Sequence, residues 1–359
     1  MLLVAAALST FVAWPLVEYD RDVGLVLGAF GAYYDHGSDT EPYRYAVQGQ
    51  VALSTRGAQD HDLGVDLPDL GGFRLTLDAH FVTDHHAHYF GLGNATSATG
   101  PPELYAAILS QLPGVRLLVR HRVAGPLFAV AGGRAIFESV GATAGSLLAA
   151  TRPLGVDGGR AIEATAGFLL DRRDREIEST RGWALEATAR VARHALGSEF
   201  TYSGFNVTGS GFLPLGDRVV VAARGIADAL FGDPPFFMLP ELGGLAWLVG
   251  PGGGTTLRGY PRGRLLGSAK VLATVEVRAR VASFAVLGHG VDVGAVGFSD
   301  AARVFSHAAP DGPLLSGKAS AGVGARLVVD RDLVVRFDWA HALGGDPDSG
   351  FYALLGETF

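Results

Sequence analysis

The chain has 359 residues, 51 of them glycine, and no cysteine, which excludes disulfide scaffolds, thiol chemistry and thiolate metal sites. A net charge of −7 and the lack of a basic stripe argue against a nucleic-acid partner. Mean hydropathy is high for a soluble protein, at +0.25, yet no internal apolar run reaches the roughly 18 residues of a membrane helix. Such a chain has either a soluble β-rich core or a membrane β-barrel.

Residues 1–20 leave two interpretations open. MLLVAAALSTFVAWP resembles the apolar part of a signal peptide, although a positively charged n-region is lacking and Ala5 to Ala7 make a poor cleavage site. Alternatively, Phe11 to Pro15 belong to the start of the folded domain. Residues 21–359 contain no linker, low-complexity tract or repeat of about 20–50 residues, so we expect a single domain there.

Apolar and polar residues alternate in one segment after another. The alternation is clearest between Phe73 and Phe81, where the apolar residues are separated by Arg74, Thr76, Asp78 and His80. It recurs near residues 43–53, 162–171, 183–191, 271–281 and 333–339. A period of two places one face of a strand in an apolar medium and the other in a polar medium.

A soluble sandwich and a membrane barrel both produce this alternation, because either can keep charged residues on one face only. Three features favour the barrel. The alternating runs are long enough for the roughly 9–11 residues that cross a tilted bilayer. Long connections (Asp84 to Pro113) alternate with tight ones (Ala124-Gly125, Asp330 to Asp332), and the chain ends on a strand with Phe359. We count 14 to 16 segments and predict an all-β transmembrane antiparallel β-barrel of 16 strands, since single-chain bacterial barrels have an even number.

The segment from Leu242 to Gly267 is too long and too glycine-rich for an ordinary connection. It is also too apolar for disorder, so we expect it to pack inside the barrel. We predict that this long loop is folded into the lumen and that Arg258, within the sequence LRGY, is its anchor. The alternative is that Arg258 is a solvated loop arginine.

Several motifs, in order, resemble the BamA/TamA superfamily of outer-membrane assembly factors, also called the bacterial surface antigen family. They are LVEYDRDVGLVLGAFGAYY near the start, Tyr89 to Asn94, Asp171 to Gly182, Leu257 to Tyr260, Val291 to Gly294, and Phe359. One departure is Ser179, which stands where the family pattern has proline. The likeness covers nearly the whole chain after residue 15.

The resemblance implies a barrel of 16 strands whose first and last strands pair weakly. It also implies that Arg258, Gly259 and Tyr260 form the tip of a lumen loop, that Arg258 binds Asp292 on the inner wall, and that Phe359 is the C-terminal assembly signal. From its inward parity, Glu276 is a plausible second partner of Arg258. A guanidinium suits this role because it binds a carboxylate with two hydrogen bonds and stays charged when desolvated.

By resemblance, the protein lies in the outer membrane of a Gram-negative bacterium as a monomeric barrel surrounded by outer-membrane lipid. It assists the insertion or translocation of polypeptides or lipid, with unfolded outer-membrane proteins as clients. Relatives with this role carry POTRA modules before the barrel, and the short segment here has no room for one, so we expect a stand-alone barrel. Two alternatives stay open: a passive or gated pore plugged by the loop, and a structural surface antigen without transport.

Other candidate sites are weaker. His80, His85, His86 and His88 with Asp84 could bind a metal, but a strand end or lumen rim is the simpler interpretation, and we predict neither metal nor cofactor. No G-x-S-x-G sequence occurs, and Gly252 to Gly254 lack the residues of a phosphate loop, so we do not expect an enzyme.

Overall fold

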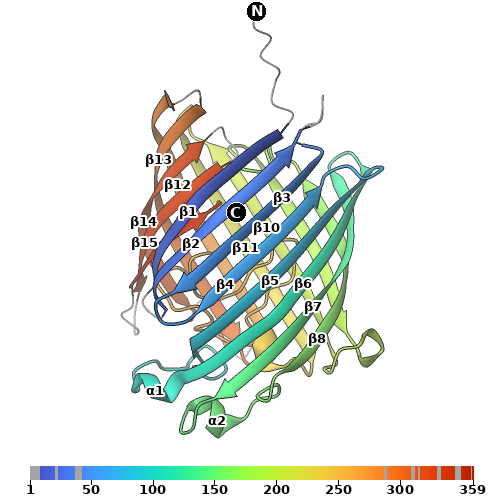
Figure 1. Ribbon diagram of the computed structural model, residues 1–359, viewed down its shortest axis with the longest axis vertical. Helices are drawn as coiled ribbons and strands as arrows, with labels where there is room; N and C mark the ends of the chain where they lie inside the picture. The colour runs from blue at the N-terminus through green and yellow to red at the C-terminus, as the bar shows by residue number, and fades with distance from the viewer. Residues whose placement is uncertain are drawn as a thin grey trace, which may run out of the picture.

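The computed structural model describes residues 9–20, 23–36, 43–286, 289–308, 312–313, 316–329, 333–343, 349–356 and 358–359. Sixteen strands form one antiparallel sheet in which each strand pairs with the next in chain order. The strands tilt around a common axis and enclose a lumen (Figure 1). The predicted fold, an all-β barrel of 16 antiparallel strands, is confirmed.

The strands are β1 (Ser9–Asp20), β2 (Gly24–Asp35), β3 (Tyr45–Ser54), β4 (Gln59–Leu67), β5 (Phe73–His88), β6 (Ala106–Ala124), β7 (Leu127–Ala142), β8 (Gly159–Asp171), β9 (Gly182–Ala192), β10 (Tyr202–Pro214), β11 (Val219–Gly232), β12 (Ala269–Val286), β13 (His289–Phe305), β14 (Lys318–Val329), β15 (Leu333–Leu343) and β16 (Ser349–Leu355). The short helices are α1 (Pro102–Tyr105) and α2 (Leu147–Thr151), with single turns η1 (His194–Leu196) and η2 (Phe236–Met238). Within the described residues, no helix is long and apolar enough to span a membrane.

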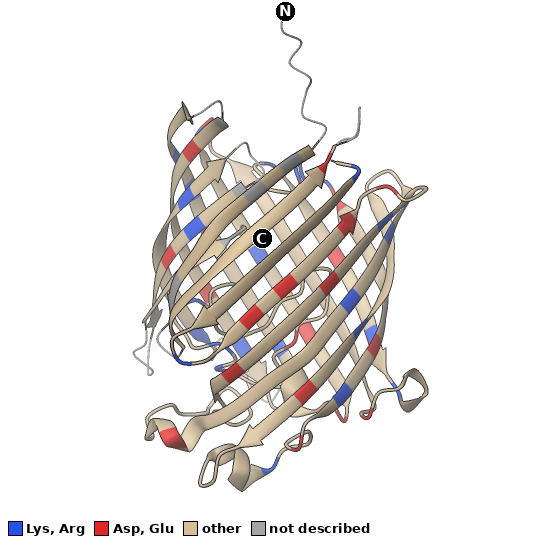
Figure 2. Ribbon diagram, in the orientation of Figure 1, with Lys and Arg blue, Asp and Glu red and all other residues tan. Residues whose placement is uncertain are grey.

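Side chains alternate between two environments along the strands, as β12 illustrates. Leu272, Thr274 and Glu276 are buried, whereas Val275 and Val277 are each 48% exposed. A soluble sandwich would bury the valines and expose the glutamate. The observed pattern is the reverse, with an apolar outer face and a polar inner face, as in a membrane barrel. Charges of both signs recur along the strands around the barrel (Figure 2).

The barrel has a seam between its first and last strands. Backbone pairing runs from β1–β2 to β15–β16, and no ladder joins β1 to β16 among the residues that the structure describes. The two strands nevertheless lie next to each other. Because β16 has 7 residues and β1 has 12, part of the edge of β1 has no counterpart in β16 among the residues that the structure describes.

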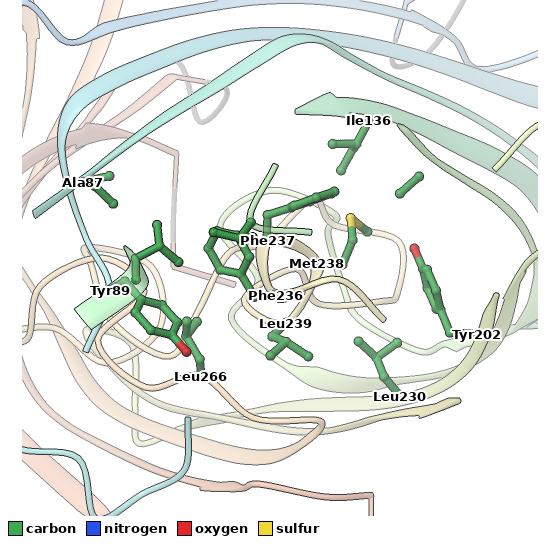
Figure 3. Packing of buried hydrophobic residues seen from close by; sticks show 14 of the residues in the cluster. Ala87, Tyr89, Ile136, Tyr202, Leu230, Phe236, Phe237, Met238, Leu239 and Leu266 are labelled. Atoms are coloured by element: carbon green, nitrogen blue, oxygen red, sulfur yellow. The ribbon is translucent and has the colours of Figure 1, made fainter. Parts of the chain in front are cut away.

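The two ends of the barrel differ. Short turns such as Gly125-Pro126 lie at one end, which we call the turn end, while α1, α2 and the three longest connections (89–105, 143–158 and 233–268) lie at the other (Figure 1). There, Phe236, Phe237, Met238 and Leu239 of the β11–β12 connection pack with buried side chains from the strand ends (Figure 3). This apolar cluster closes over the lumen at the end that carries the helices.

Of the two interpretations of residues 1–20, the structure supports the barrel entry for residues 9–20, because β1 begins at Ser9. Two other expected boundaries need correction. The long connection predicted from Asp84 to Pro113 is confined to residues 89–105, because β5 and β6 extend through bulged pairs such as Asp84 with Leu109. The last strand ends at Leu355, before Phe359. The tight turn predicted at 330–332 and the signal-like residues 1–8 lie outside the described residues.

We expect an arginine at position 275 to destabilise the barrel in lipid. Val275 lies on the outer face, far from both ends of β12. Burying a charge at the bilayer midplane costs about 2–4 kcal/mol, and the cost falls to about 0–1 kcal/mol near the interface. The free energy of unfolding of V275R, measured by denaturant titration in lipid vesicles, should fall by the larger amount. The control is L213R, one residue before the turn end of β10, where the smaller loss is expected; equal losses would contradict this placement in the membrane.

Candidate functional site

The connection between β11 and β12, residues 233–268, folds back into the barrel and places its LRGY tip against the inner wall. Leu257 and Tyr260 are buried at the tip, packed against Ile226 and Leu272 of the wall. These contacts remove the tip from solvent. The loop is therefore part of the barrel's core, as the sequence predicted for the lumen loop.

Arg258 is completely buried between three wall strands. Its Nε and Nη2 lie 2.8 and 2.9 Å from the two carboxylate oxygens of Asp300 on β13. Its Nη1 lies 3.0 Å from Asp338 on β15 and 2.9 Å from Glu276 on β12. The guanidinium also stacks on Phe298, with Cζ 3.4 Å from the ring centroid. A planar fork with five donors can satisfy all of these acceptors at once, whereas a lysine ammonium cannot.

The carboxylates around Arg258 are shared with other arginines. Arg326 donates to Asp338 at 2.6 Å, and Arg336 donates to the same carboxylate at 2.9 Å. Arg278 donates to Glu276 at 2.8 Å. The buried cluster thus consists of four arginines (Arg258, Arg278, Arg326 and Arg336) and three carboxylates (Glu276, Asp300 and Asp338). Each carboxylate is compensated, which burial of charge requires.

The two residues after Arg258 attach the tip to the last strands. Gly259 has φ of +90°, and a Cβ there would lie 3.1–3.3 Å from backbone atoms of β15, so only glycine fits without strain. Its N–H donates to the hydroxyl of Tyr352 on β16 at 2.9 Å. Tyr260 is 1% exposed, and its hydroxyl reaches the carbonyls of Ala319 and Leu343 at 3.3 and 3.5 Å. The tip therefore links β12 through β16.

A second ionic cluster holds the first half of the loop. Glu241 accepts from Arg134 on β7 at 2.7 Å and from Trp247 Nε1 at 2.9 Å. Two residues further on, the N–H of Gly243 donates to Asp228 at 2.9 Å. A Cβ at Gly243 would lie 1.9 Å from an Arg190 nitrogen, so a side chain here would displace Arg190, which pairs with Asp228. The loop is therefore attached to the wall at two sites, one at Glu241 and Gly243 and the other at its LRGY tip.

The structure brings together Arg258, Gly259, Tyr260 and Glu276, but Asp292 lies elsewhere and its predicted pairing is corrected. Asp292 is near the start of β13, and its closest ion pair is with Arg280 at 3.8 Å. Asp300, which binds Arg258, comes eight residues later in the same strand, a distance of about 27 Å at about 3.4 Å per residue. Asp300 and Asp338 were missed; their signal in the sequence is that both are acidic residues within apolar strands.

The C-terminal residues also lie in the lumen. After β16, Thr358 is 4% exposed; its hydroxyl donates to Glu276 at 3.1 Å, and its carbonyl accepts from Arg224 at 2.6 Å. The ring of Phe359 lies 5.9 Å from that of Phe212. Phe359 is therefore inside the barrel instead of on the terminal strand as expected, and its role as an assembly signal stays a prediction.

The histidine-rich segment lies on β5, where His80 contacts Asp62 at 2.5 Å and its ring lies tilted against that of Trp247. Among the described residues, no group of three or more His, Asp or Glu is arranged to hold a metal ion. The segment belongs to the strand and to the wall facing the loop.

Comparison with known proteins places the chain among outer-membrane barrels. The sequence profile of the Omp85 superfamily domain matches residues 160–359. A comparison with curated proteins finds no match. Among solved structures, the barrel is similar to BamA from Haemophilus ducreyi lacking POTRA domains 1–3, with a TM-score of 0.58 and 15% identity over 97% of this chain and 70% of that one.

A second similar structure is CdiB from Escherichia coli, with a TM-score of 0.58 and 15% identity. The match covers 97% of this chain but 62% of CdiB, so this chain spans less than two thirds of that protein. Identities this low show a common fold alone and do not show a common activity.

We expect R258A to be strongly destabilised, because it leaves Asp300, Asp338 and Glu276 buried with less compensation. Breaking a buried ion pair by removing one partner costs about 3–5 kcal/mol. Denaturant unfolding in vesicles measures this loss. R258K, which keeps the charge but lacks the planar fork, should recover only part of it.

The matched control is D292N. Asp292 is partly exposed and pairs loosely, at 3.8 Å, so its neutralisation should cost less than about 1 kcal/mol. D300N should instead resemble R258A. A larger loss for D292N than for D300N would show that the arginine is held by the residue predicted from the sequence.

Proposed function

Because the chain belongs to the Omp85 superfamily, we propose that it is an outer-membrane β-barrel that assists the insertion or translocation of polypeptides at the outer membrane of a Gram-negative bacterium. The role is one of transport, without a catalytic step. The short turns would face the periplasm and the long connections the exterior, as in bacterial barrels generally. Its clients would be unfolded outer-membrane proteins, with lipid as a further substrate.

The observation that supports this proposal is the seam. Edge strands present unpaired N–H and C=O groups and are templates for pairing with another chain. In lipid such groups cannot be satisfied by water, so an open edge is costly unless another strand covers it. A short β16 beside a longer β1 leaves such an edge in the wall, where an incoming strand could add by β-augmentation.

The lumen loop would control how β16 sits at the seam. Gly259 is bonded to Tyr352 of β16, and Arg258 is bonded to Asp338 of the neighbouring β15. The loop thus holds the last two strands to the wall formed by β12 and β13. Movement of β16 away from β1 would require either that these contacts break or that the loop moves with it.

A gated pore is the second candidate, and it is favoured by one observation: the loop occupies the lumen and is attached at two ionic clusters. In a plugged pore, deletion of residues 250–267 would raise conductance while the barrel still folds. In an assembly factor, the same deletion would impair folding of the barrel itself. Planar-bilayer conductance and folding yield therefore separate the two.

The first test is client insertion. The purified barrel, reconstituted in liposomes, should accelerate the folding of a small unfolded outer-membrane protein relative to empty liposomes. The matched control is a barrel with its seam closed by an engineered disulfide. One cysteine is introduced by F351C and the second by F11C, A13C or P15C. Since the chain has no cysteine of its own, these two can form a disulfide only with each other, across the seam.

Closing the seam should abolish the acceleration, and reduction of the disulfide should restore it. Acceleration that persists with the seam closed would show that clients do not use it. A folded barrel that never accelerates insertion would leave the plugged pore as the better account.

We expect Y352F to loosen β16. The substitution removes the acceptor of the Gly259 N–H, which then stays buried without its partner, at a cost of about 1–3 kcal/mol. Amide hydrogen exchange in β16 should rise by about fivefold or more. Y33F on the outer face of β2 is the control and should leave exchange unchanged. Equal exchange in wild type and Y352F would mean that the loop does not restrain the last strand.

A further inference from the structure

The connection between β8 and β9, residues 172–181, reaches across the turn end of the lumen. On one side, Glu176 pairs with Arg74 of β5 at 2.6 Å and with Arg120 of β6 at 3.4 Å. Burial raises the pKa of the Glu176 carboxyl, but Arg74 and Arg120 outweigh it, so this pKa lies below its ordinary value and the carboxylate stays ionised. The connection is thereby tied to the wall opposite β12.

The same connection is internally ordered. Asp174 accepts from the backbone N–H groups of Thr180 and Arg181 at 2.9 and 3.0 Å, and the hydroxyl of Ser179 donates to the carbonyl of Arg175 at 2.6 Å. Ser179 is the residue that stands in place of the proline of the family pattern. The connection is thus a fixed cover and not a loose turn.

Beneath this cover, between it and β11–β14, lies a cavity of about 200 Å³. Five arginines line it: Arg175, Arg218, Arg278, Arg280 and Arg326. Only three carboxylates do so, and most of the remaining lining residues are valine and alanine. Several guanidinium groups around one small cavity make a site for an anion, because each can donate two parallel hydrogen bonds to an oxyanion.

The carboxylates do not neutralise this cavity. Arg175 pairs with Glu178 at 3.2 Å, and Arg280 pairs loosely with Asp292 at 3.8 Å. Arg218 is exposed and makes no ion pair with any residue that the structure describes. Arg278 and Arg326 already pair with Glu276 and Asp338 of the buried cluster around Arg258. Over the cavity and that cluster together, seven arginines face six side-chain carboxylates.

We propose that this cavity at the turn end of the lumen binds a phosphate group. A phosphate ester carries a charge of about −1.5 to −2 at neutral pH and three acceptor oxygens, which can accept from several of the guanidinium groups that line the cavity at once. Arginine is the side chain best suited to recognise phosphate through paired donors. The source is either a free phosphate or the headgroup of a lipid, for which the apolar part of the wall would contact the adjoining carbons.

Binding of an anion in the cavity would change the ion pairs that hold the lumen loop. Arg278 and Arg326 line the cavity and also donate to Glu276 and Asp338, which hold Arg258. An anion that draws these two arginines toward the cavity weakens their hold on the carboxylates and changes the compensation of Arg258. This site is separate from the seam, so it stands or fails independently of client insertion.

The test is titration calorimetry of the full-length barrel in a non-ionic detergent with inorganic phosphate at constant ionic strength. The variants are R218A and R280A, both in exposed positions where folding is not at risk. Loss of one charged hydrogen-bond donor should weaken binding by about tenfold. R152A is the control: Arg152 lies by α2 at the opposite end and is similarly exposed, and its loss should change nothing.

A second arm replaces inorganic phosphate with a short-chain phosphatidic acid below its micelle concentration. Binding that is about tenfold tighter than phosphate, and still weakened by R218A, identifies a lipid headgroup as the source. Equal affinity identifies a free phosphate. Two results overturn the proposal: no binding of either ligand at millimolar concentration, or binding that R218A and R280A leave as strong as R152A does.

Discussion

The structure depends on the burial of one guanidinium group in the wall of a barrel. Arg258 has no exposed surface, and its charge is tolerated only because Asp300, Asp338 and Glu276 converge on it from three strands. Desolvation makes such a group costly when any partner is missing. The loop therefore has one position in which its tip is stable, and the strands that supply the carboxylates are fixed relative to one another by the same contacts.

That constraint explains the arrangement of the rest of the lumen. Glycine is required at position 259 because the tip approaches the backbone of β15 so closely that a side chain would collide with it. Tyr352 completes the contact from β16, which otherwise has only β15 as a ladder partner among the described strands. The strand at the seam is thus held by the ladder with β15 on one side and by the loop from the inside.

Much of the fold followed from the sequence, because period-two alternation with charges on one face is a local pattern that can be read within each strand. Strand number, antiparallel order and the inward loop were all predictable, and the family resemblance was confirmed by the match over residues 160–359. The pairing of Arg258 was not predictable, because Asp292 and Asp300 share a strand and a face, and only the depth of the loop decides between them. The inward path of Phe359 was missed because the apolar end of the chain resembles a strand up to its last residue, whereas β16 stops at Leu355.

An ionic anchor differs from an apolar one in a way that suits a movable loop. Apolar contacts are non-directional, so a loop held by them could slide by a residue and lose little. The Arg258 fork accepts only one arrangement of carboxylates, which gives the loop a defined register in the lumen even though the net stability it adds is modest. Water that entered the lumen would solvate both partners and lower the cost of separating them. Opening at the seam would admit that water. The open arrangement would then be stabilised by solvation of the ionic groups, and the closed arrangement by the exclusion of water, as a two-state element requires.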